Sequence, residues 1–233
     1  MVASSTAQRT ALVTGSARRV GRLIAQALVA DGWRVLIHAT LEQAARDAAD
    51  AMGAAGSVGA DLRDPEAADV IAAAVRTQLG GRLDLLVNSA SSFERVEQWE
   101  AAGLDGWARA MDVNARAPYL LMGALLPELT AAEGLIVNIS DRAAHEHWPT
   151  FPIHSASKAA LDSLTLSGAT ALAPVGVRVN AIAPGTILPP DSWDAARIKL
   201  EEAAGRIGST DELASLVIAL ANDPARTGEI IVL

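Results

Sequence analysis

The sequence predicts an α/β fold of the doubly wound type: a single domain with a parallel sheet and helices on both faces. Short runs rich in Val, Leu and Ile alternate along the 233 residues with longer Ala-rich stretches of helical period. Most of the short runs are apolar throughout, as strands are when both faces of their sheet are buried. Repeated alternation of strand and helix is typical of a doubly wound parallel sheet.

Seven segments are predicted to be strands, because each is short, aliphatic and bounded by turn residues. They are Thr10–Thr14, Arg34–His38, Ser57–Ala60, Leu83–Asn88, Leu135–Ser140, Val177–Ala183 and Glu229–Leu233. The intervening stretches are predicted to be helices. They are Val20–Asp31, Leu41–Met52, Pro65–Leu79, Leu104–Thr130, Ile153–Ala173 and Thr210–Asn222.

The chain shows no linker or break in composition, so residues 10–233 are predicted to form one domain. Residues 1–9 are polar and are expected to be a flexible tail. Residues 188–205 contain the only Pro-Pro pair and a short helical pattern, and are predicted to be a flap over a substrate site.

Composition excludes several classes of protein. Hydrophobic residues make up 51% and charged residues 20% of the chain, which excludes extensive disorder. A net charge of −8 argues against nucleic-acid binding through bulk positive charge. The absence of cysteine excludes disulfides, thiolate zinc sites and thiol catalysis. No signal-peptide core and no apolar run of roughly 18 residues are present, so a cytoplasmic protein without a membrane partner is expected.

A loop bounded by two glycines follows the first predicted strand, where Gly15 to Gly21 leads into a helix. Glycines at such a turn let the backbone approach a diphosphate at the helix N-terminus. The middle glycine of the usual pattern is Arg19 here, and an ordinary strand–helix turn is the alternative. The residues expected to line a dinucleotide are Gly15, Ser16, Arg18, Arg19 and Val20.

The second and third strand ends indicate which nucleotide is bound. An NAD enzyme of this kind places an acid after the second strand, whereas this chain has His38, Ala39 and Thr40, which are expected to contact the cofactor. Arg18 can pair with a 2′-phosphate, so NADPH is the expected cofactor. Asp61 and Leu62, after the third strand, are expected to meet the adenine.

These residues, together with motifs further along the chain, resemble the short-chain dehydrogenase/reductase family from Thr10 to Leu233. The matching motifs are the glycine loop, Asp61-Leu62, Asn88-Ser89-Ala90, Asn114, Lys158 and Pro184-Gly185. The resemblance implies a Rossmann fold with strand order 3-2-1-4-5-6-7, a nicotinamide cofactor, a small-molecule substrate and a homo-tetramer. Further cofactor contacts are expected from Asn88, Ser89, Ala90, Lys158, Pro184, Gly185, Thr186 and Ile187.

A narrower resemblance is to pteridine reductase. It is carried by Arg19 in the glycine loop, by the run Asn-Ser-Ala-Ser-Ser-Phe at 88–93, and by Asp141 where most of the family has a catalytic serine. It implies that Phe93 stacks on a pterin opposite the nicotinamide, and that Arg19, Ser91 and Asp141 contact the substrate. The chain has only two Phe, which makes Phe93 informative, although a core aromatic is the alternative.

The catalytic motif departs from the family pattern. The family carries Tyr-x-x-x-Lys, and here Lys158 is present but the tyrosine position is His154. The resemblance implies that Lys158 and Asn114 hold the nicotinamide ribose and a proton relay. The only tyrosine, Tyr119, lies on the preceding predicted helix and is not expected to substitute.

Two interpretations of His154 remain open. Histidine is a capable general acid, with an ordinary pKa of about 6.5, and Asp141 would favour its charged form while Lys158 would disfavour it. Alternatively, His154 is inert and the proton reaches a dihydropterin through Asp141 and water. The leading hypothesis is an NADPH-dependent reductase resembling pteridine reductase. The alternatives are a carbonyl reductase using His154 as acid, and a catalytically silent NADP(H)-binding protein.

One candidate metal motif is set aside. His145 and His147 lie two positions apart in a predicted loop, with Glu146 between them. Without further ligands such residues would make a poor metal chelate. No metal is therefore expected.

Overall fold

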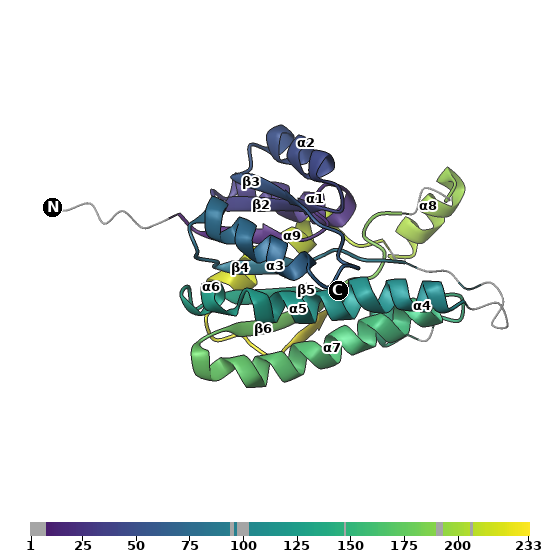
Figure 1. Cartoon of the computed structure of the whole chain (residues 1–233). Coiled ribbons are helices and arrows are strands. Elements are labelled where there is room, and N and C mark those ends of the chain that lie inside the picture. Colours follow the sequence, from purple (N-terminus) through teal and green to yellow (C-terminus); the bar gives the residue numbers. More distant parts are fainter. Residues whose placement is uncertain (1–7, 94–95, 97–102, 147, 190–192, 206) are drawn as a thin grey trace.

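The computed structural model describes residues 8–93, 96, 103–146, 148–189, 193–205 and 207–233 (Figure 1). It contains a seven-stranded parallel sheet of order β3-β2-β1-β4-β5-β6-β7. The predicted fold class and strand order are confirmed. The strands are β1 Thr10–Val13, β2 Arg34–Ala39, β3 Gly56–Gly59, β4 Leu85–Asn88, β5 Leu135–Ile139, β6 Arg178–Ala183 and β7 Ile230–Val232.

Helices cover both faces of the sheet (Figure 1). They are α1 Arg19–Ala30, α2 Glu42–Met52, α3 Ala67–Ala74, α4 Leu104–Met111, α5 Ala117–Ala124, α6 Leu126–Thr130, α7 Pro152–Leu172, α8 Ala195–Ala203 and α9 Thr210–Asn222. Successive side chains of a strand point to opposite faces, so Leu12 packs with α3, α5 and α6 while Val13 packs with α1 and α9. Each face therefore has its own buried core.

The predicted helix over residues 104–130 is divided in the structure. A π-helical turn at Asp112–Arg116 separates α4 from α5, and the chain turns again at Leu125 before α6. Pro127 explains the second break, because its ring has no N–H and crowds the preceding helical turn. The π-helical turn contains Asn114, one of the predicted site residues. Such turns within helices are frequent at functional sites.

The predicted helix over residues 65–79 also differs in detail. The α-helix starts at Ala67, because Asp64 accepts a hydrogen bond from the backbone N–H of Glu66 in a turn that precedes it. The segment ends in a π-helical turn at Val75–Leu79. Neither difference moves a predicted site residue.

One residue of the predicted N-terminal tail makes tertiary contacts. Residues 1–7 of the predicted tail lie outside the described residues, but Arg9 is anchored. Its guanidinium lies 4.0 Å from the centre of the Trp33 ring and donates to Asn222 Oδ1 at 2.6 Å. These partners are distant in sequence, so local composition does not reveal the contacts of this residue.

The predicted flap contains one helix, α8, which stands out from the body of the domain (Figure 1). Residues 190–192 of this segment lie outside the described residues. In the part of the chain that the structure describes, no helix is both long enough and apolar enough to cross a membrane.

Candidate active site

The glycine loop between β1 and α1 needs both of its glycines. Gly15 has φ +65°, and a Cβ there would lie 2.8 Å from the Cα of Ala90. Gly21 has ordinary φ, but a Cβ would lie 2.5 Å from the carbonyl oxygen of Gly15. The first glycine therefore lets the loop pass close to the segment after β4, and the second lets α1 pack under the loop.

Two arginines flank the N-terminus of α1. Arg18 is its exposed N-cap residue, and Arg19 follows with φ +51°, in the left-handed region where the sequence pattern expects glycine. The guanidinium of Arg19 donates to the carbonyl oxygen of Leu188 at 2.9 Å, so it reaches the start of the predicted flap. Both cations lie where a helix N-terminus already favours an anion.

The ring of His38 forms hydrogen bonds within the protein. Its Nδ1 accepts from the N–H of Gly15 at 3.1 Å, which leaves the proton on Nε2 to donate to the carbonyl oxygen of Ala60 at 3.0 Å. The ring is buried, and burial lowers the pKa of His38 to about 4. His38 therefore holds the glycine loop to the ends of β2 and β3 as a neutral side chain. At the end of β2, the side chains that remain predicted to contact the cofactor are those of Ala39 and Thr40.

Acid is expected to weaken the fold through His38. The unfolded chain binds a proton at this residue below about pH 6.5, whereas the folded chain resists it until about pH 4. The free energy of unfolding should therefore fall by about 3 kcal/mol as the pH drops through this window. The measurement is denaturant unfolding between pH 7 and 4, compared with His38→Asn, which keeps an acceptor for Gly15 but does not titrate. Equal pH dependence of the two proteins would contradict this role.

The segment after β4 is tied to the glycine loop and to the sheet. Thr14 Oγ1 accepts from the N–H groups of Ser89 and Ala90, at 3.0 and 3.1 Å. The amide of Asn88 is buried and donates to Asn138 Oδ1 at 2.8 Å. Of the three residues predicted here for the cofactor, Asn88 thus directs its side chain into the sheet, where it joins β4 to β5.

An exposed ion pair lies after β3, where the adenine is predicted to bind. Arg63 donates to both carboxylate oxygens of Asp61, and this guanidinium holds the pKa of Asp61 below its usual range. Leu62 is buried beside it. Asp61 is therefore charged and remains partly exposed after β3, and its contact with an adenine stays a prediction.

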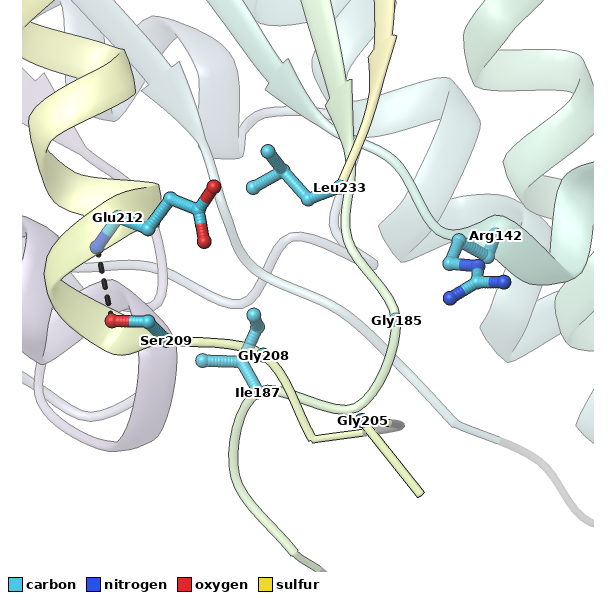
Figure 2. Close-up of a pocket in the computed structure, with 8 residues that line it drawn as sticks. All are labelled: Arg142, Gly185, Ile187, Gly205, Gly208, Ser209, Glu212 and Leu233. Carbon is cyan, nitrogen blue, oxygen red and sulfur yellow. Dashed lines mark hydrogen bonds between the residues drawn. The ribbon is translucent and has the colours of Figure 1, made fainter. Parts of the chain in front are cut away.

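The residues after β6 line a small pocket at the carboxyl edge of the sheet, where open α/β sheets bind ligands (Figure 2). Its volume is about 70 Å³. The lining residues are Arg142, Gly185, Ile187, Gly205, Gly208, Ser209, Glu212 and Leu233. The N–H of Gly208 donates to the carbonyl oxygen of Thr186 at 2.8 Å. The segment that follows the predicted flap is thus joined to the predicted cofactor segment Pro184–Ile187.

Helix α7 carries Lys158, which is predicted to hold the nicotinamide ribose. Lys158 is buried and donates from Nζ to the carbonyl oxygen of Ile139 at 2.7 Å, and burial lowers the pKa of Lys158 to about 8. Asn114 Oδ1 accepts from the N–H of Ser92 at 2.7 Å, and its Nδ2 donates to the Ser92 carbonyl and to Ser157 Oγ. The amide of Asn114 therefore joins the segment after β4 to α7.

His154 and Asp141 lie side by side, as the sequence spacing predicts. His154 Nδ1 is 3.3 Å from the carbonyl oxygen of Ser92, and Nε2 is 3.4 Å from Asp141 Oδ2. Asp141 Oδ1 accepts from the N–H of Ala143 at 2.8 Å, which fixes the carboxylate. Both ring nitrogens thus face acceptor oxygens.

An aromatic cluster stands beside this pair. Phe93 is half exposed, and its ring centre lies 4.3 Å from that of His154 and 4.4 Å from that of Phe151. Trp148 meets Phe151 edge-on at 6.2 Å. Both Phe of the chain are thus in one cluster. Sequence reasoning did not select Phe151, although its position three residues before His154 places it near the site.

The remaining candidate residues are Ser91, Tyr119 and the possible metal ligands. Ser91 is exposed next to the aromatic cluster, as a substrate contact requires. Tyr119 is 59% exposed on α5, which agrees with the expectation that it does not replace the missing tyrosine. Among the described residues no group of three or more His, Cys, Asp or Glu is placed to hold a metal ion, and His147 lies outside them.

The comparison with known proteins agrees with this geometry. The family model described as short chain dehydrogenase matches residues 9–198. Trans-4-hydroxycyclohexanecarboxylate dehydrogenase of Sinomonas cyclohexanicum is 32% identical over 233 residues, which cover 95% of this chain and 89% of that protein.

Solved structures give the same result. RhlG of Pseudomonas aeruginosa, in a complex with NADP, superposes with a TM-score of 0.90 and 31% identity over 98% of this chain and 96% of that one. L-sorbose reductase of Gluconobacter frateurii, in a complex with NADPH and L-sorbose, has a TM-score of 0.86 and 25% identity over 97% and 95%. The chain is therefore an oxidoreductase of the short chain dehydrogenase family.

Proposed function

We propose that the protein is an NADPH-dependent reductase, similar to pteridine reductase, that transfers a hydride to a dihydropterin or a related heterocycle. The observation that carries the proposal is the half-exposed ring of Phe93 beside the Asp141–His154 pair. A flat heterocycle stacks well on such a ring. A fixed carboxylate offers acceptor oxygens to the N–H groups at the edge of a heterocycle.

The residues at the nucleotide end fit NADPH. Gly15 and Gly21 allow close approach of a diphosphate to the N-terminus of α1. Arg18 is exposed at that N-terminus, and β2 ends without an acid that would repel a 2′-phosphate. NADPH, when bound, supplies the hydride. Lys158 would hold its ribose from α7.

The protein side of the reaction rests on four residues. Asp141 passes a proton from water to the heterocycle, with its carboxylate fixed at Oδ1 by the N–H of Ala143 and with Oδ2 facing His154. Arg19 and Ser91 orient the substrate. Asn114 acts as a positioning residue, because its amide fixes the segment that carries Ser91 and Phe93.

A carbonyl reductase is the second candidate. It is favoured by the 3.4 Å approach of His154 Nε2 to Asp141, because a neighbouring carboxylate stabilises the imidazolium that would protonate a ketone. The names of L-sorbose reductase and trans-4-hydroxycyclohexanecarboxylate dehydrogenase describe carbonyl and alcohol substrates of those proteins. The third candidate function is that of a catalytically silent NADP(H)-binding protein.

Consumption of NADPH with different substrates distinguishes the three candidate functions. A dihydropterin reductase oxidises NADPH with dihydrobiopterin or dihydrofolate, and a carbonyl reductase does so only with a simple diketone. A silent protein binds NADPH and oxidises it with none of them. The assay needs only purified protein and the absorbance of NADPH.

Removal of the Phe93 ring should weaken substrate binding. Phe93→Ala is expected to reduce affinity for dihydrobiopterin by about 5- to 30-fold, since aromatic stacking contributes about 1–2 kcal/mol, and to leave NADPH affinity unchanged. Fluorescence titration measures both. Val70→Ala, which trims a side chain of similar exposure on α3, is the control. A lower unfolding temperature with unchanged ligand affinity would make Phe93 a packing residue only.

A homo-oligomer, and specifically a tetramer, belongs to the same proposal. Helix α7 runs alongside α4 and α5, which follow one another end to end (Figure 1). The three helices expose large apolar side chains. These are Leu104, Trp107, Tyr119 and Leu166. Exposed apolar surface of this kind is typical of protein–protein contacts, and a second copy of the chain would cover it.

A further inference from the structure

A row of rings runs outward from the Asp141–His154 pair, and its outer members have no role in the proposed reaction. The ring centre of Phe93 lies 4.3 Å from that of His154 and 4.4 Å from that of Phe151. Trp148 meets Phe151 edge-on, with the ring centres 6.2 Å apart and the ring planes at 68°. A heterocycle that stacks on Phe93 would face the inner part of this row, and Phe151 and Trp148 continue the row beyond it.

The row holds aromatic side chains that are scarce in this protein. The whole chain has two Phe, one Tyr and five Trp, and the row contains both Phe and one Trp. The side chain of Phe93 is 50% exposed, and those of Phe151 and Trp148 are partly exposed. Rings that served only as core packing would be buried, because they carry a large apolar surface. Partly exposed aromatic rings beside a reacting group are typical of a ligand site.

Hydrogen bonds hold the outer end of the row in place. Trp148 Nε1 donates to Glu146 Oε2 at 3.1 Å, and Arg142 Nε donates to Glu146 Oε1 at 2.7 Å. The N–H of Val96 donates to the carbonyl oxygen of Thr150 at 2.9 Å, which joins the two segments that carry the row. Because the indole N–H already has an acceptor, the Trp148 ring offers only its carbon surface to a ligand.

The steep angle between the Phe151 and Trp148 rings makes them an apolar corner, which we call the aromatic corner. A flat aryl ring matches such a corner, because it stacks on the face of one ring while its edge meets the other. Offset stacking and edge-to-face contact are the two arrangements that aromatic rings favour. An aliphatic group gains only ordinary apolar burial there, and a charged group would lose hydration.

We propose that Phe151 and Trp148 form a subsite for an aryl group attached to the part of the substrate that is reduced. The substrate is then a heterocycle or a carbonyl compound that carries an aromatic substituent, and Trp148 is a specificity-determining residue. The inference rests on the proposed position of the reacting group beside Asp141 and His154. It holds whether that group belongs to a dihydropterin or to a ketone.

Two matched pairs of ligands isolate the aryl contact. The first pair is a dihydropterin with a methyl group at C6 and its benzyl analogue, and the second is butanedione and phenylpropanedione. Within each pair the second ligand adds an aromatic ring. Affinities are measured by calorimetry on protein loaded with NADP⁺, so the test needs no turnover. We expect the aryl ligand of a pair to bind about 3- to 10-fold more tightly than its methyl partner, the size typical of one aromatic contact.

Variants of the aromatic corner should remove this preference. Trp148→Leu is expected to weaken the aryl ligands by about 3- to 10-fold and to leave the methyl ligands unchanged. Trp148→Phe, which keeps an aromatic ring, should retain most of the preference. Phe151→Leu removes the other wall of the corner and should act in the same direction as Trp148→Leu. Val175→Ala trims an exposed apolar side chain in the turn after α7, and is the control that should leave every affinity unchanged.

A second readout locates the bound aryl group. The chain has five Trp, so protein labelled with ¹⁵N at tryptophan gives five indole N–H resonances, and Trp148→Phe assigns that of Trp148. The aryl ligands should shift this resonance through the ring current, and their methyl partners should leave it in place. An aryl preference among the diketones alone would contradict the dihydropterin proposal and still support the subsite. Equal affinity within both pairs, or an aryl preference that survives in both Trp148→Leu and Phe151→Leu, would overturn the subsite.

Discussion

Asp141→Ala is expected to lower the turnover of dihydrobiopterin by about 10²- to 10⁴-fold, the usual range for loss of a general acid–base group. Asp141 is the carboxylate that the N–H of Ala143 fixes, and its second oxygen faces His154. The affinity for NADPH should be unchanged, because the expected nucleotide contacts lie elsewhere. Steady-state turnover and a fluorescence titration provide the two readings.

His154→Ala is the matched comparison for this prediction. His154 Nε2 is 3.4 Å from Asp141 Oδ2, which is long for a charge-assisted hydrogen bond. If Asp141 and water deliver the proton, the loss of the ring should cost less than about tenfold in turnover, below the range for an acid–base group. A loss of about 10² or more in His154→Ala on dihydrobiopterin would instead make histidine the working acid.

NADPH is expected to bind about 10- to 150-fold more tightly than NADH, because a guanidinium–phosphate hydrogen bond contributes roughly 1.5–3 kcal/mol. Arg18 is the exposed cation at the N-terminus of α1, and no acid ends β2. Arg18→Ala should remove most of the difference in affinity between the two nucleotides, because it weakens the binding of NADPH alone. Fluorescence titration with both nucleotides measures it.

The control for this preference is Arg226→Ala. Arg226 pairs with Glu229 on the surface before β7, at the opposite edge of the sheet from the carboxyl ends of the strands. It should leave both affinities unchanged. Equal affinity for the two nucleotides in the parent protein, or tighter binding of NADH, would contradict the assignment of Arg18 and of the second strand end.

The fold could be predicted because its determinants are local patterns. Continuous apolar runs define β1, β4 and β5, and the glycines at 15 and 21 mark the first strand–helix turn. The exceptions depend on tertiary contacts. The anchoring of Arg9 on Trp33 joins residues far apart in the sequence, and the division of the helix at 104–130 depends on a π-helical turn that no local pattern indicates.

The site could be predicted only in part for the same reason. Resemblance to the family selected Phe93, Asp141 and His154, and the structure places the Phe93 ring beside His154 and His154 beside Asp141. The inward orientation of the His38 ring depends on its pairing with Gly15 across two strands. The contact between His145 and Asp162 links a loop to a helix 17 positions later, a relation that no sequence period reveals.

In the proposed reaction, the protein passes a hydride from NADPH to a dihydropterin. The most direct measurement uses NADPH that carries two deuterium atoms at C4 of the nicotinamide, incubated with the protein and dihydrobiopterin. Mass spectrometry of the product is expected to show one deuterium in each tetrahydrobiopterin, formed at the rate at which NADPH disappears. No deuterium in the pterin and no loss of NADPH, with both ligands bound, would contradict the account.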